Sequence, residues 1–360
     1  MKYFNYLFLL VFLVVLAVGV ISFYSDFSFT KSIEQKAAIG SVVAGKRYGS
    51  LLAEKREIEL AKAREINLVL VGDVMLARGV ANQIKKHDDF NYPFLNVADF
   101  LNSADLVFGN LEGPISEQGK NQGSVYSFKA EPGVVQGLSF AGFSVMSLAN
   151  NHILDWGTQA MLDTVDLLGA RGIKTVGAGR DYDSANQPVI LERNGTKIAF
   201  LAYTNLLPKS FAARENTSGI SDFDISKIKA KIEELKTRAD LVIVSMHWGE
   251  EYQTKANLSQ QKIAHELIED GADLVVGHHP HVPEEIEQYN PPSRKATEWR
   301  GGWIIYSLGN FVFDQNFSEE TMGGLMAKVK IVDGKINGVE PIKIKINSTF
   351  QPYLEIENRK

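Results

Sequence analysis

Short apolar runs that end in polar side chains recur between residues 66 and 315, and this recurrence constrains the fold of the chain most strongly. The runs are rich in Val, Ile and Leu and have the length of buried strands. They span residues 67–71, 105–108, 143–148, 241–245, 272–276 and 302–308. Segments of helical period lie between several of them, at 131–141, 158–171, 225–238 and 259–270. This alternation predicts an α/β fold.

Two predicted hairpins extend the same domain. Asn194-Gly195 and Asp333-Gly334 each separate two apolar segments. Dipeptides of this kind favour two-residue turns between antiparallel strands. We find no internal repeat and no linker within residues 66–350. We therefore expect one domain there, followed by a tail at 351–360.

The first 25 residues predict a single-pass membrane anchor. Residues 3–25 carry no charge, and a helix of that length reaches about 35 Å, enough to cross a hydrocarbon core of about 30 Å. A cleaved signal peptide is the alternative, but no small-x-small cleavage site follows the apolar run. Residues 26–65 mix charged and apolar side chains and predict a stalk, helical from residue 53 to 66. We expect the protein in the cell membrane with its domain outside the cytoplasm, although more basic residues follow the apolar run than precede it.

Charge and cysteine content exclude several classes of protein. The net charge of −5 gives no indication of a nucleic-acid-binding surface. The chain has no cysteine, which excludes disulfides, thiolate metal ligands and a thiol nucleophile. A metal site in this chain must therefore use nitrogen and oxygen ligands.

Polar side chains that follow the predicted strands form a candidate metal site. They are Asp73, Glu112, Asn151, His152, His247, His279 and His281. Open α/β sheets bind ligands at the carboxyl ends of their strands. Carboxylate, amide and imidazole ligands together suit Mn, Fe or Zn, and a carboxylate can bridge two ions. We therefore expect one or two divalent ions at this edge.

Three histidines lie in one segment, Gly277-His278-His279-Pro280-His281, which follows the predicted strand at 272–276. Pro280 favours an extended conformation at His279, and residues two apart in an extended segment face the same way. We therefore expect His279 and His281 to point at the metal and His278 to point away. On this view, replacing His278 with Ala has little effect on metal content.

Two further residues are candidates for binding a substrate. Arg78 lies one turn past Asp73 and is placed either to bind an anionic group or to lie on the surface of a helix. Asn310 follows the predicted strand at 302–308. It either closes the site from that strand or simply ends the strand.

Taken together, the motifs resemble the signature blocks of the CapA-type capsule-synthesis proteins, which are associated with poly-γ-glutamate capsules. The blocks are Gly72-Asp73-Val74-Met75, Asn110-Leu111-Glu112, Ser147-Leu148-Ala149-Asn150-Asn151-His152, His247-Trp248-Gly249, His279-Pro280-His281 and Tyr306-Ser307-Leu308-Gly309-Asn310-Phe311. They occur in the family's order over roughly residues 66–315. The resemblance implies a four-layer α-β-β-α sandwich, related to that of the calcineurin-like metallophosphoesterases.

The resemblance also implies a role for each residue. Asp73 resembles the first metal-binding Asp of the phosphoesterases, Glu112 stands at the bridging acid, and His152 resembles the histidine that protonates the leaving group. The remaining ligands would be Asn151, His247, His279 and His281.

Three positions depart from the phosphoesterase or family pattern. Met75 replaces the histidine of the phosphoesterase Asp-x-His, and the bridging acid is Glu112 rather than Asp. Glu284 stands where relatives often carry Gln. Because one imidazole of the first site is missing, a single ion or a weakly held second ion fits as well as a complete two-metal centre.

Two functions follow from the resemblance. In the first, the protein is a metal-dependent hydrolase of a phosphoester or a cell-envelope polymer, with His152 as general acid. In the second, it is a membrane-anchored accessory of a capsule synthase or exporter that binds the anionic polymer without turnover. The second function requires partner membrane proteins, and neither involves nucleic acid.

Overall fold

The computed structural model describes residues 65–291 and 301–355, together with residues 14–21 and scattered positions from 24 to 36. The chain divides into two compact units, Met1–Ala63 and Arg64–Lys360. In the first unit, residues 14–21 are helical. Across the described residues, no helix is both long and apolar enough to cross a membrane. Most of the predicted anchor, and the predicted stalk helix up to residue 64, lie outside the described residues.

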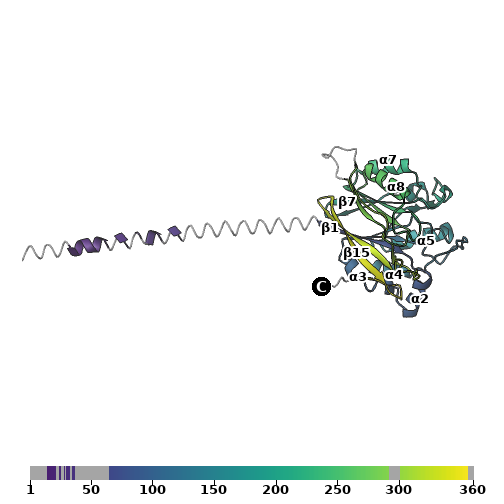
Figure 1. The fold of residues 1–360 in the computed structure, drawn as a ribbon, viewed down its shortest axis with the longest axis horizontal. Helices are drawn as coiled ribbons and strands as arrows, with labels where there is room; N and C mark the ends of the chain where they lie inside the picture. The colour runs from purple at the N-terminus through teal and green to yellow at the C-terminus, as the bar shows by residue number, and fades with distance from the viewer. Residues whose placement is uncertain are drawn as a thin grey trace, which may run out of the picture. The chain divides into compact units, whose positions relative to one another are not determined.

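The second unit is built on two large sheets (Figure 1). The first sheet has the order β16-β15-β14-β1-β2-β3-β4, with β13 also paired to β1. Its strands are β1 (Glu65–Val74), β2 (Leu106–Leu111), β3 (Val145–Ser147), β4 (Lys174–Val176), β13 (Asn310–Val312), β14 (Gly323–Val332), β15 (Lys335–Ile346) and β16 (Pro352–Leu354). Strands β1 to β4 and β13 pair in parallel, whereas β14 to β16 are antiparallel.

The second sheet has the order β11-β12-β10-β9-β7-β6. Its strands are β6 (Val189–Arg193), β7 (Thr196–Thr204), β9 (Leu241–His247), β10 (Leu274–His278), β11 (Ile286–Tyr289) and β12 (Gly302–Ile305). The central strands pair in parallel, and β6 and β11 run antiparallel at the edges. A small separate sheet joins β5 (Ala178–Gly179) to β8 (Gly219–Ile220).

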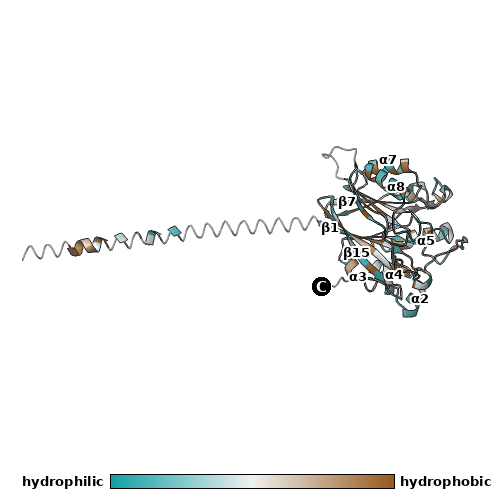
Figure 2. Cartoon of the chain, in the orientation of Figure 1, coloured by the Kyte–Doolittle hydropathy of each residue, from teal (hydrophilic) through white to brown (hydrophobic). Residues whose placement is uncertain are grey.

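Helices cover the outer faces of both sheets, with α7 and α8 on one side and α2, α3 and α4 on the other (Figure 1). Their bounds are α2 (Arg78–His87), α3 (Ala98–Asn102), α4 (Val134–Phe140), α5 (Gly157–Ala170), α6 (Tyr182–Asn186), α7 (Ile225–Leu235) and α8 (Leu258–Glu269), with short 3-10 turns at Tyr92–Phe94 and Lys209–Phe211. The visible part of α7 carries both hydrophobic and hydrophilic residues (Figure 2), as expected for a helix with one buried face.

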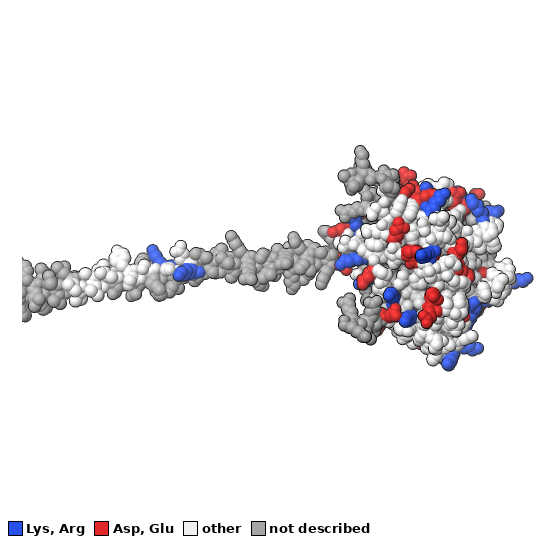
Figure 3. All heavy atoms as spheres, in the orientation of Figure 1, with Lys and Arg blue, Asp and Glu red and all other residues white. Residues whose placement is uncertain are grey.

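Acidic and basic side chains are interspersed over the visible face of the second unit (Figure 3). Several oppositely charged groups pair directly: Lys227 Nζ lies 2.7 Å from Asp222, and Lys229 Nζ lies 3.0 Å from Asp270. The visible face thus carries charges of both signs, some of which neutralise one another in ion pairs.

Three hydrophobic cores give the order of the layers. Leu68 and Leu70 of β1 pack with Phe200 of β7 in the core between the sheets. The alternate residues of β1, Val69 and Val71, pack instead in a core with α2, α4 and α5. A third core joins the second sheet to α7 and α8. The α/β prediction is therefore confirmed, and the layers follow the order helix, sheet, sheet, helix. Since both faces of β1 are buried from Leu68 onwards, residues 68–71 form a continuous apolar run.

Both predicted hairpins form. Asn194 and Gly195 have φ of 48° and 77°, and Asp333 and Gly334 have φ of 50° and 71°. Two successive residues of positive φ match the right-handed twist of the strands that they connect. The final strand, β16, lies in the segment expected as a tail, and Ile66 belongs to β1 rather than to the stalk helix.

The predicted strand at 302–308 is wrong in its extent, because the chain changes sheets there. The strand β12 ends at Ile305 in the second sheet, and β13 begins at Asn310 beside Asp73 in the first. The chain crosses with Gly309 at φ 71°. A Cβ atom on Gly72 would lie 1.9 Å from the carbonyl oxygen of Gly309, so only glycine allows this approach.

Candidate metal centre

The polar strand ends of both sheets meet at one edge of the molecule. Asp73, Glu112, His247 and His281 are each no more than 2% exposed. Asp73 lies at the end of β1, Glu112 follows β2, and His247 ends β9. One ligand atom each of Asp73, Glu112 and His247 lies within 4.8 Å of the other two. Residues that are remote in sequence are thus brought together at the carboxyl ends of parallel strands, as predicted.

Asp73 is held as an anion in the centre of the cluster. Its Oδ1 accepts a hydrogen bond from Asn110 Nδ2 at 2.8 Å, and its Oδ2 accepts one from the backbone N–H of His279 at 3.2 Å. Nδ1 of His278 and of His281 each lie 3.4 Å from its oxygens. Burial acts to raise the pKa of Asp73, but the two imidazoles outweigh it and hold the pKa well below its usual range.

Glu112 is a buried carboxyl group whose oxygens accept no hydrogen bond from the described residues. His281 Nε2 lies 3.6 Å and His152 Nε2 lies 3.7 Å from its Oε1. Burial raises the pKa of Glu112 to about 7, and the charge of Asp73 adds to this rise. Because a buried carboxylate that accepts no hydrogen bond is costly, a cation is the group that this position fits. Nδ1 of His279 is also without a partner among the described residues.

His247, His279 and Asn151 form the other side of the cluster. His247 Nε2 lies 2.7 Å from Asn151 Oδ1, and the rings of His247 and His279 are 4.9 Å apart. Burial and the neighbouring imidazoles lower the pKa of His247 well below its usual value and the pKa of His279 to about 3. Both rings are therefore neutral, the form that binds a metal.

His281 connects the two carboxylates. Burial acts to lower its pKa, but Glu112 and Asp73 outweigh burial and raise the pKa of His281 to about 9. Asn310 Oδ1 lies 3.0 Å from His281 Nδ1. The Nδ2 of Asn310 donates to Gln315 and to the carbonyl oxygen of Thr321. Asn310 thus contacts His281 from the first strand residue of β13.

The expectation of an extended segment around Pro280 is wrong. His279 and His281 have φ of 97° and 61°, a left-handed conformation that is rare outside glycine and concentrated at functional sites. This turn, rather than strand alternation, brings the two rings near each other, with 5.9 Å between their centres. His278 is fully buried beside Asp73 rather than pointing away.

We predict that His278→Ala lowers the free energy of unfolding by about 2–4 kcal/mol, as other large-to-small changes in a core do. The change leaves a cavity and removes an imidazole next to the buried Asp73 carboxylate. Urea denaturation of the metal-free protein measures the loss. His87→Ala, at an exposed position of α2, is the matched control and should cost less than about 1 kcal/mol. Equal values for the two variants would contradict the placement of His278.

His152 is fixed from the side opposite the cluster. Its Nδ1 lies 2.8 Å from Asp155 Oδ2, and Asp155 also accepts hydrogen bonds from Ser124 Oγ and from the backbone N–H of Phe128. Burial acts to lower the pKa of His152, but the hydrogen bond to Asp155 and the charge of Glu112 outweigh it, so the pKa is raised. Asp155 was not predicted, although it follows His152 by only three positions.

Arg78 lies beside the cluster without reaching its ligands. It forms an ion pair with Asp314, and its guanidinium lies 4.6 Å from the centre of the Phe128 ring. Phe128 in turn packs on His152, with 4.2 Å between the ring centres. Since Asp314 already neutralises Arg78, an anionic group would have to share this arginine with Asp314.

Glu251 is a further residue of the site that was not predicted. One of its carboxylate oxygens lies within 4.8 Å of ligand nitrogens of His279 and His281, and the three residues form a second group able to hold a metal ion. The side chain is half-buried. Its position four residues after His247 is the only signal in the sequence, and that signal is weak because surface loops are rich in acids.

Glu284 packs behind the loop that carries His281. It is 5% exposed and accepts a hydrogen bond from Gln260 Nε2 at 2.6 Å. The Oε1 of Gln260 accepts one from the backbone N–H of Asn257, the N-cap of α8. Burial raises the pKa of Glu284 to about 7, an effect that Glu285 reinforces.

We predict that Glu284→Gln raises the melting temperature at pH 8 but not at pH 5. The folded protein retains a proton on Glu284 that the unfolded chain releases above about pH 4.5. Stability therefore falls between about pH 4.5 and 7, by on the order of 2 kcal/mol, and the amide abolishes this loss. Melting curves of the metal-free protein at both pH values measure it, with the exposed Glu250→Gln as control. A gain of the same size at pH 5 would contradict the assignment.

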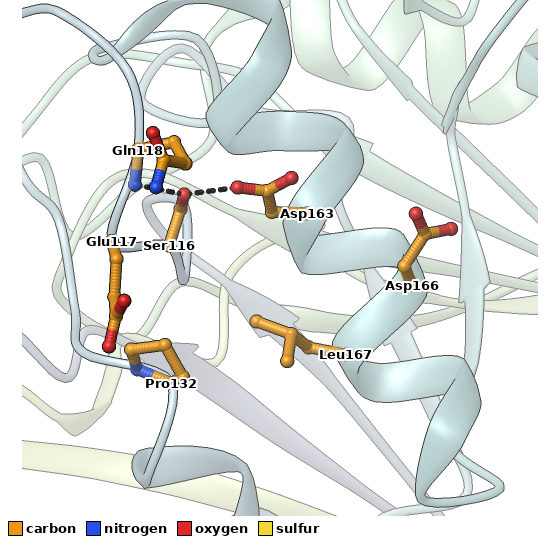
Figure 4. Close-up of a pocket in the computed structure, with 7 residues that line it drawn as sticks. All are labelled: Ser116, Glu117, Gln118, Pro132, Asp163, Asp166 and Leu167. Carbon is orange, nitrogen blue, oxygen red and sulfur yellow. Dashed lines mark hydrogen bonds between the residues drawn. The ribbon is translucent and has the colours of Figure 1, made fainter.

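A surface cavity of about 300 Å³ lies between α5 and the segment of Ser116, Glu117 and Gln118 (Figure 4). It is lined by Ser116, Glu117, Gln118, Pro132, Asp163, Asp166 and Leu167. Ser116 Oγ donates to Asp163 and accepts from the backbone N–H of Gln118. The cavity shares no residue with the two groups of residues that could hold a metal ion.

Comparison with known proteins identifies the family. Residues 67–315 match the family described as bacterial capsule synthesis protein PGA_cap. The chain belongs to this family. It is 35% identical over 269 residues to the PGA biosynthesis protein CapA of Bacillus subtilis (strain 168), covering 74% of this chain and 68% of that protein. It is 33% identical over 262 residues to the capsule biosynthesis protein CapA of Bacillus anthracis, covering 71% and 61%.

This PGA_cap chain thus spans about two thirds of the length of these relatives. Similar solved structures include the NAD nucleotidase NadN of Haemophilus influenzae, with a TM-score of 0.47 and 12% identity over 82% of this chain and 54% of that chain. A 5′-nucleotidase precursor of Thermus thermophilus has a TM-score of 0.45 and 13% identity, covering 81% and 54%.

Proposed function

We propose that this PGA_cap chain is a metal-dependent hydrolase of capsule biosynthesis. The observation that carries the proposal is the placement of His152. One ring nitrogen is held by Asp155 at 2.8 Å, and the other faces Glu112 at 3.7 Å. A ring anchored in this way lies over the metal cluster without being one of its ligands, which is the position that a general acid needs.

The residues present fit a divalent ion, because two buried oxygens of Glu112 and one buried nitrogen of His279 have no hydrogen-bond partner among the described residues. The residues that would hold it are Asp73, Glu112, Asn151, His247, His279 and His281. When bound, a divalent ion polarises the scissile group and activates water. Mn, Fe or Zn suits a set of carboxylate, amide and imidazole ligands.

The protein's own step is proton transfer from His152. The raised pKa keeps a larger share of His152 protonated near neutral pH than an ordinary histidine. As the bond to the leaving group breaks, Nε2 donates its proton to the leaving oxygen or nitrogen. Asp155 accepts a hydrogen bond at Nδ1 and offsets the positive charge of the ring before transfer.

The substrate class comes from the relatives' names and from the resemblance of the motifs to phosphoesterases. The Bacillus relatives are named for PGA and capsule biosynthesis, which supports an anionic γ-glutamyl polymer. The phosphoesterase-like ligand order supports a phosphoester. Arg78, at the rim beside Phe128, is placed to meet an anionic group of either substrate if Asp314 releases it.

A second function is favoured by Met75. Because this position lacks the imidazole of the phosphoesterase pattern, the centre can be a binding site without turnover. The protein would then be an accessory that binds the anionic polymer through the metal, together with capsule synthase or export proteins of the membrane. A relative from Mycobacterium tuberculosis, 32% identical, is named as a polyglutamine synthesis accessory protein.

Metal analysis of the purified full-length protein, followed by a screen of phosphoesters and poly-γ-glutamate, tests the proposal. We expect at least one bound Mn, Fe or Zn per chain and metal-dependent hydrolysis of one substrate class. Bound metal with binding of the polymer but no hydrolysis would favour the accessory function. A protein that binds no divalent ion would contradict both functions.

We also propose that residues 1–25 anchor the protein in the cell membrane with the hydrolase domain outside the cytoplasm. The support is the uncharged run from residue 3 to 25. Deleting residues 1–25 should release a folded protein into the soluble fraction, while the full chain pellets with membranes. Recovery of the full chain in shortened, soluble form would instead indicate a cleaved signal peptide.

A further inference from the structure

We propose that Glu251 is a metal ligand that compensates for the missing imidazole at Met75. This inference rests on the metal centre of the proposed function, and not on hydrolysis. It assigns a direct role to a residue that lies outside the motifs that identify the family. Three observations carry it: the surroundings of Met75, the position of Glu251 and the unpartnered atoms near Glu251.

Met75 itself offers no suitable ligand. Its side chain is fully buried, and its sulfur accepts a hydrogen bond from the backbone N–H of Ala77 at 3.1 Å. A thioether is also a soft ligand that suits Cu(I) rather than Mn or Zn. The position of Met75 therefore adds no ligand beside Asp73, where Glu112 and the imidazoles of His247, His278 and His281 remain.

Glu251 approaches His279 and His281 from the loop that follows β9. Its carboxylate and ligand nitrogens of His279 and His281 all lie within 4.8 Å of one another. The two loops are joined by backbone hydrogen bonds, from Trp248 N–H to the His278 carbonyl at 3.1 Å and from Tyr252 N–H to the Pro280 carbonyl at 2.8 Å. Glu251 is thus held beside the histidines by main-chain contacts on both sides of it.

Unpartnered buried atoms indicate where the ion would lie. Both carboxylate oxygens of Glu112 and Nδ1 of His279 have no hydrogen-bond partner among the described residues. Glu112 is 1% exposed and His279 is 8% exposed, so water does not readily satisfy them. His281 lies 3.6 Å from Glu112 and within the Glu251 group. Glu251 and Glu112 therefore both lie near His281. Each of the two acids belongs to one of the two groups of residues that could hold a metal ion.

The exchange of an imidazole for a carboxylate changes the expected metal. Carboxylate oxygens are harder ligands than imidazole and favour Mn²⁺ relative to Zn²⁺. Ionised Asp73, Glu112 and Glu251 would supply three negative charges against the four positive charges of two divalent ions. Without Glu251, one more positive charge would be left uncompensated in a buried site.

The test is Mn²⁺ binding by calorimetry to the full-length protein, with Zn²⁺ as the second probe. Glu251→Gln should raise the Kd for Mn²⁺ at least ~10-fold, since losing even an outer partner of a ligand costs about 10–100-fold. Glu250→Gln, the exposed neighbour, should leave the Kd unchanged. Glu251→Asp, which keeps the charge on a shorter side chain, should lie between. Glu251→His should shift the preference towards Zn²⁺.

The outcomes separate this inference from the proposed function. Wild-type affinity for Mn²⁺ in Glu251→Gln overturns the inference and leaves the hydrolase intact. Weakened Mn²⁺ binding in Glu251→Gln supports the inference even if no substrate is hydrolysed. A wild-type protein that binds neither ion overturns both. Melting temperatures without metal check folding, and if Glu251→Gln unfolds, the Glu251→Asp and Glu251→His measurements decide.

Discussion

His152→Asn is expected to lower the rate of hydrolysis by ~10²–10⁴ while metal content stays at the wild-type value and the protein stays folded. The ring is held by Asp155 and lies 3.7 Å from Glu112, but it is not needed to complete the ligand set. An asparagine in this place keeps a polar side chain but cannot donate a proton as an acid. Metal analysis and initial rates on the substrate found by the screen measure the two quantities separately.

The pH profile gives a second measurement of the same residue. Because His152 acts as an acid, kcat/KM should fall as pH rises through its raised pKa, and His152→Asn should abolish this fall. Asp155→Asn, which removes the hydrogen bond at Nδ1, should move the fall to lower pH while leaving part of the rate. A His152→Asn protein that hydrolyses substrate at the wild-type rate would remove His152 from the mechanism.

The positions of the candidate ligands could be predicted because they follow from the order of strands. Asp73, Glu112 and His247 each come directly after a buried apolar run, and parallel strands place such positions at one edge. The burial of both faces of β1 explains why these runs contain few polar residues. The turn dipeptides Asn194-Gly195 and Asp333-Gly334 located both hairpins, because they favour positive φ at both turn positions.

Other parts of the site depend on contacts between segments that the sequence does not order. The loop that carries His279 and His281 has a left-handed backbone at both residues, whereas Pro280 alone favoured extended backbone. Asn310 reaches His281 because the chain changes sheets at Gly309. In neither case does the local pattern of apolar residues carry the information, because close approach of two backbones leaves no periodic signal.

The second large effect is expected at Asp73. Asp73→Asn should raise the Kd for the metal by more than ~10²-fold, because losing a residue that merely contacts a ligand already costs about 10–100-fold. The loss of metal should also abolish hydrolysis. The amide is neutral, and it cannot accept from both Asn110 and the backbone N–H of His279 as the carboxylate does. It also withdraws the negative charge between His278 and His281.

The metal-free Asp73→Asn protein should lose about 1–3 kcal/mol of unfolding free energy, because one buried donor is left without an acceptor. Calorimetry with Mn²⁺, substrate turnover and urea denaturation measure the three effects. Asp99→Asn, an exposed acid in α3, is the control and should change none of them. Since Asp73→Asn removes metal and turnover together while His152→Asn removes turnover alone, the pair separates ligand from general acid. An Asp73→Asn protein that keeps its metal would place the ion elsewhere in the cluster.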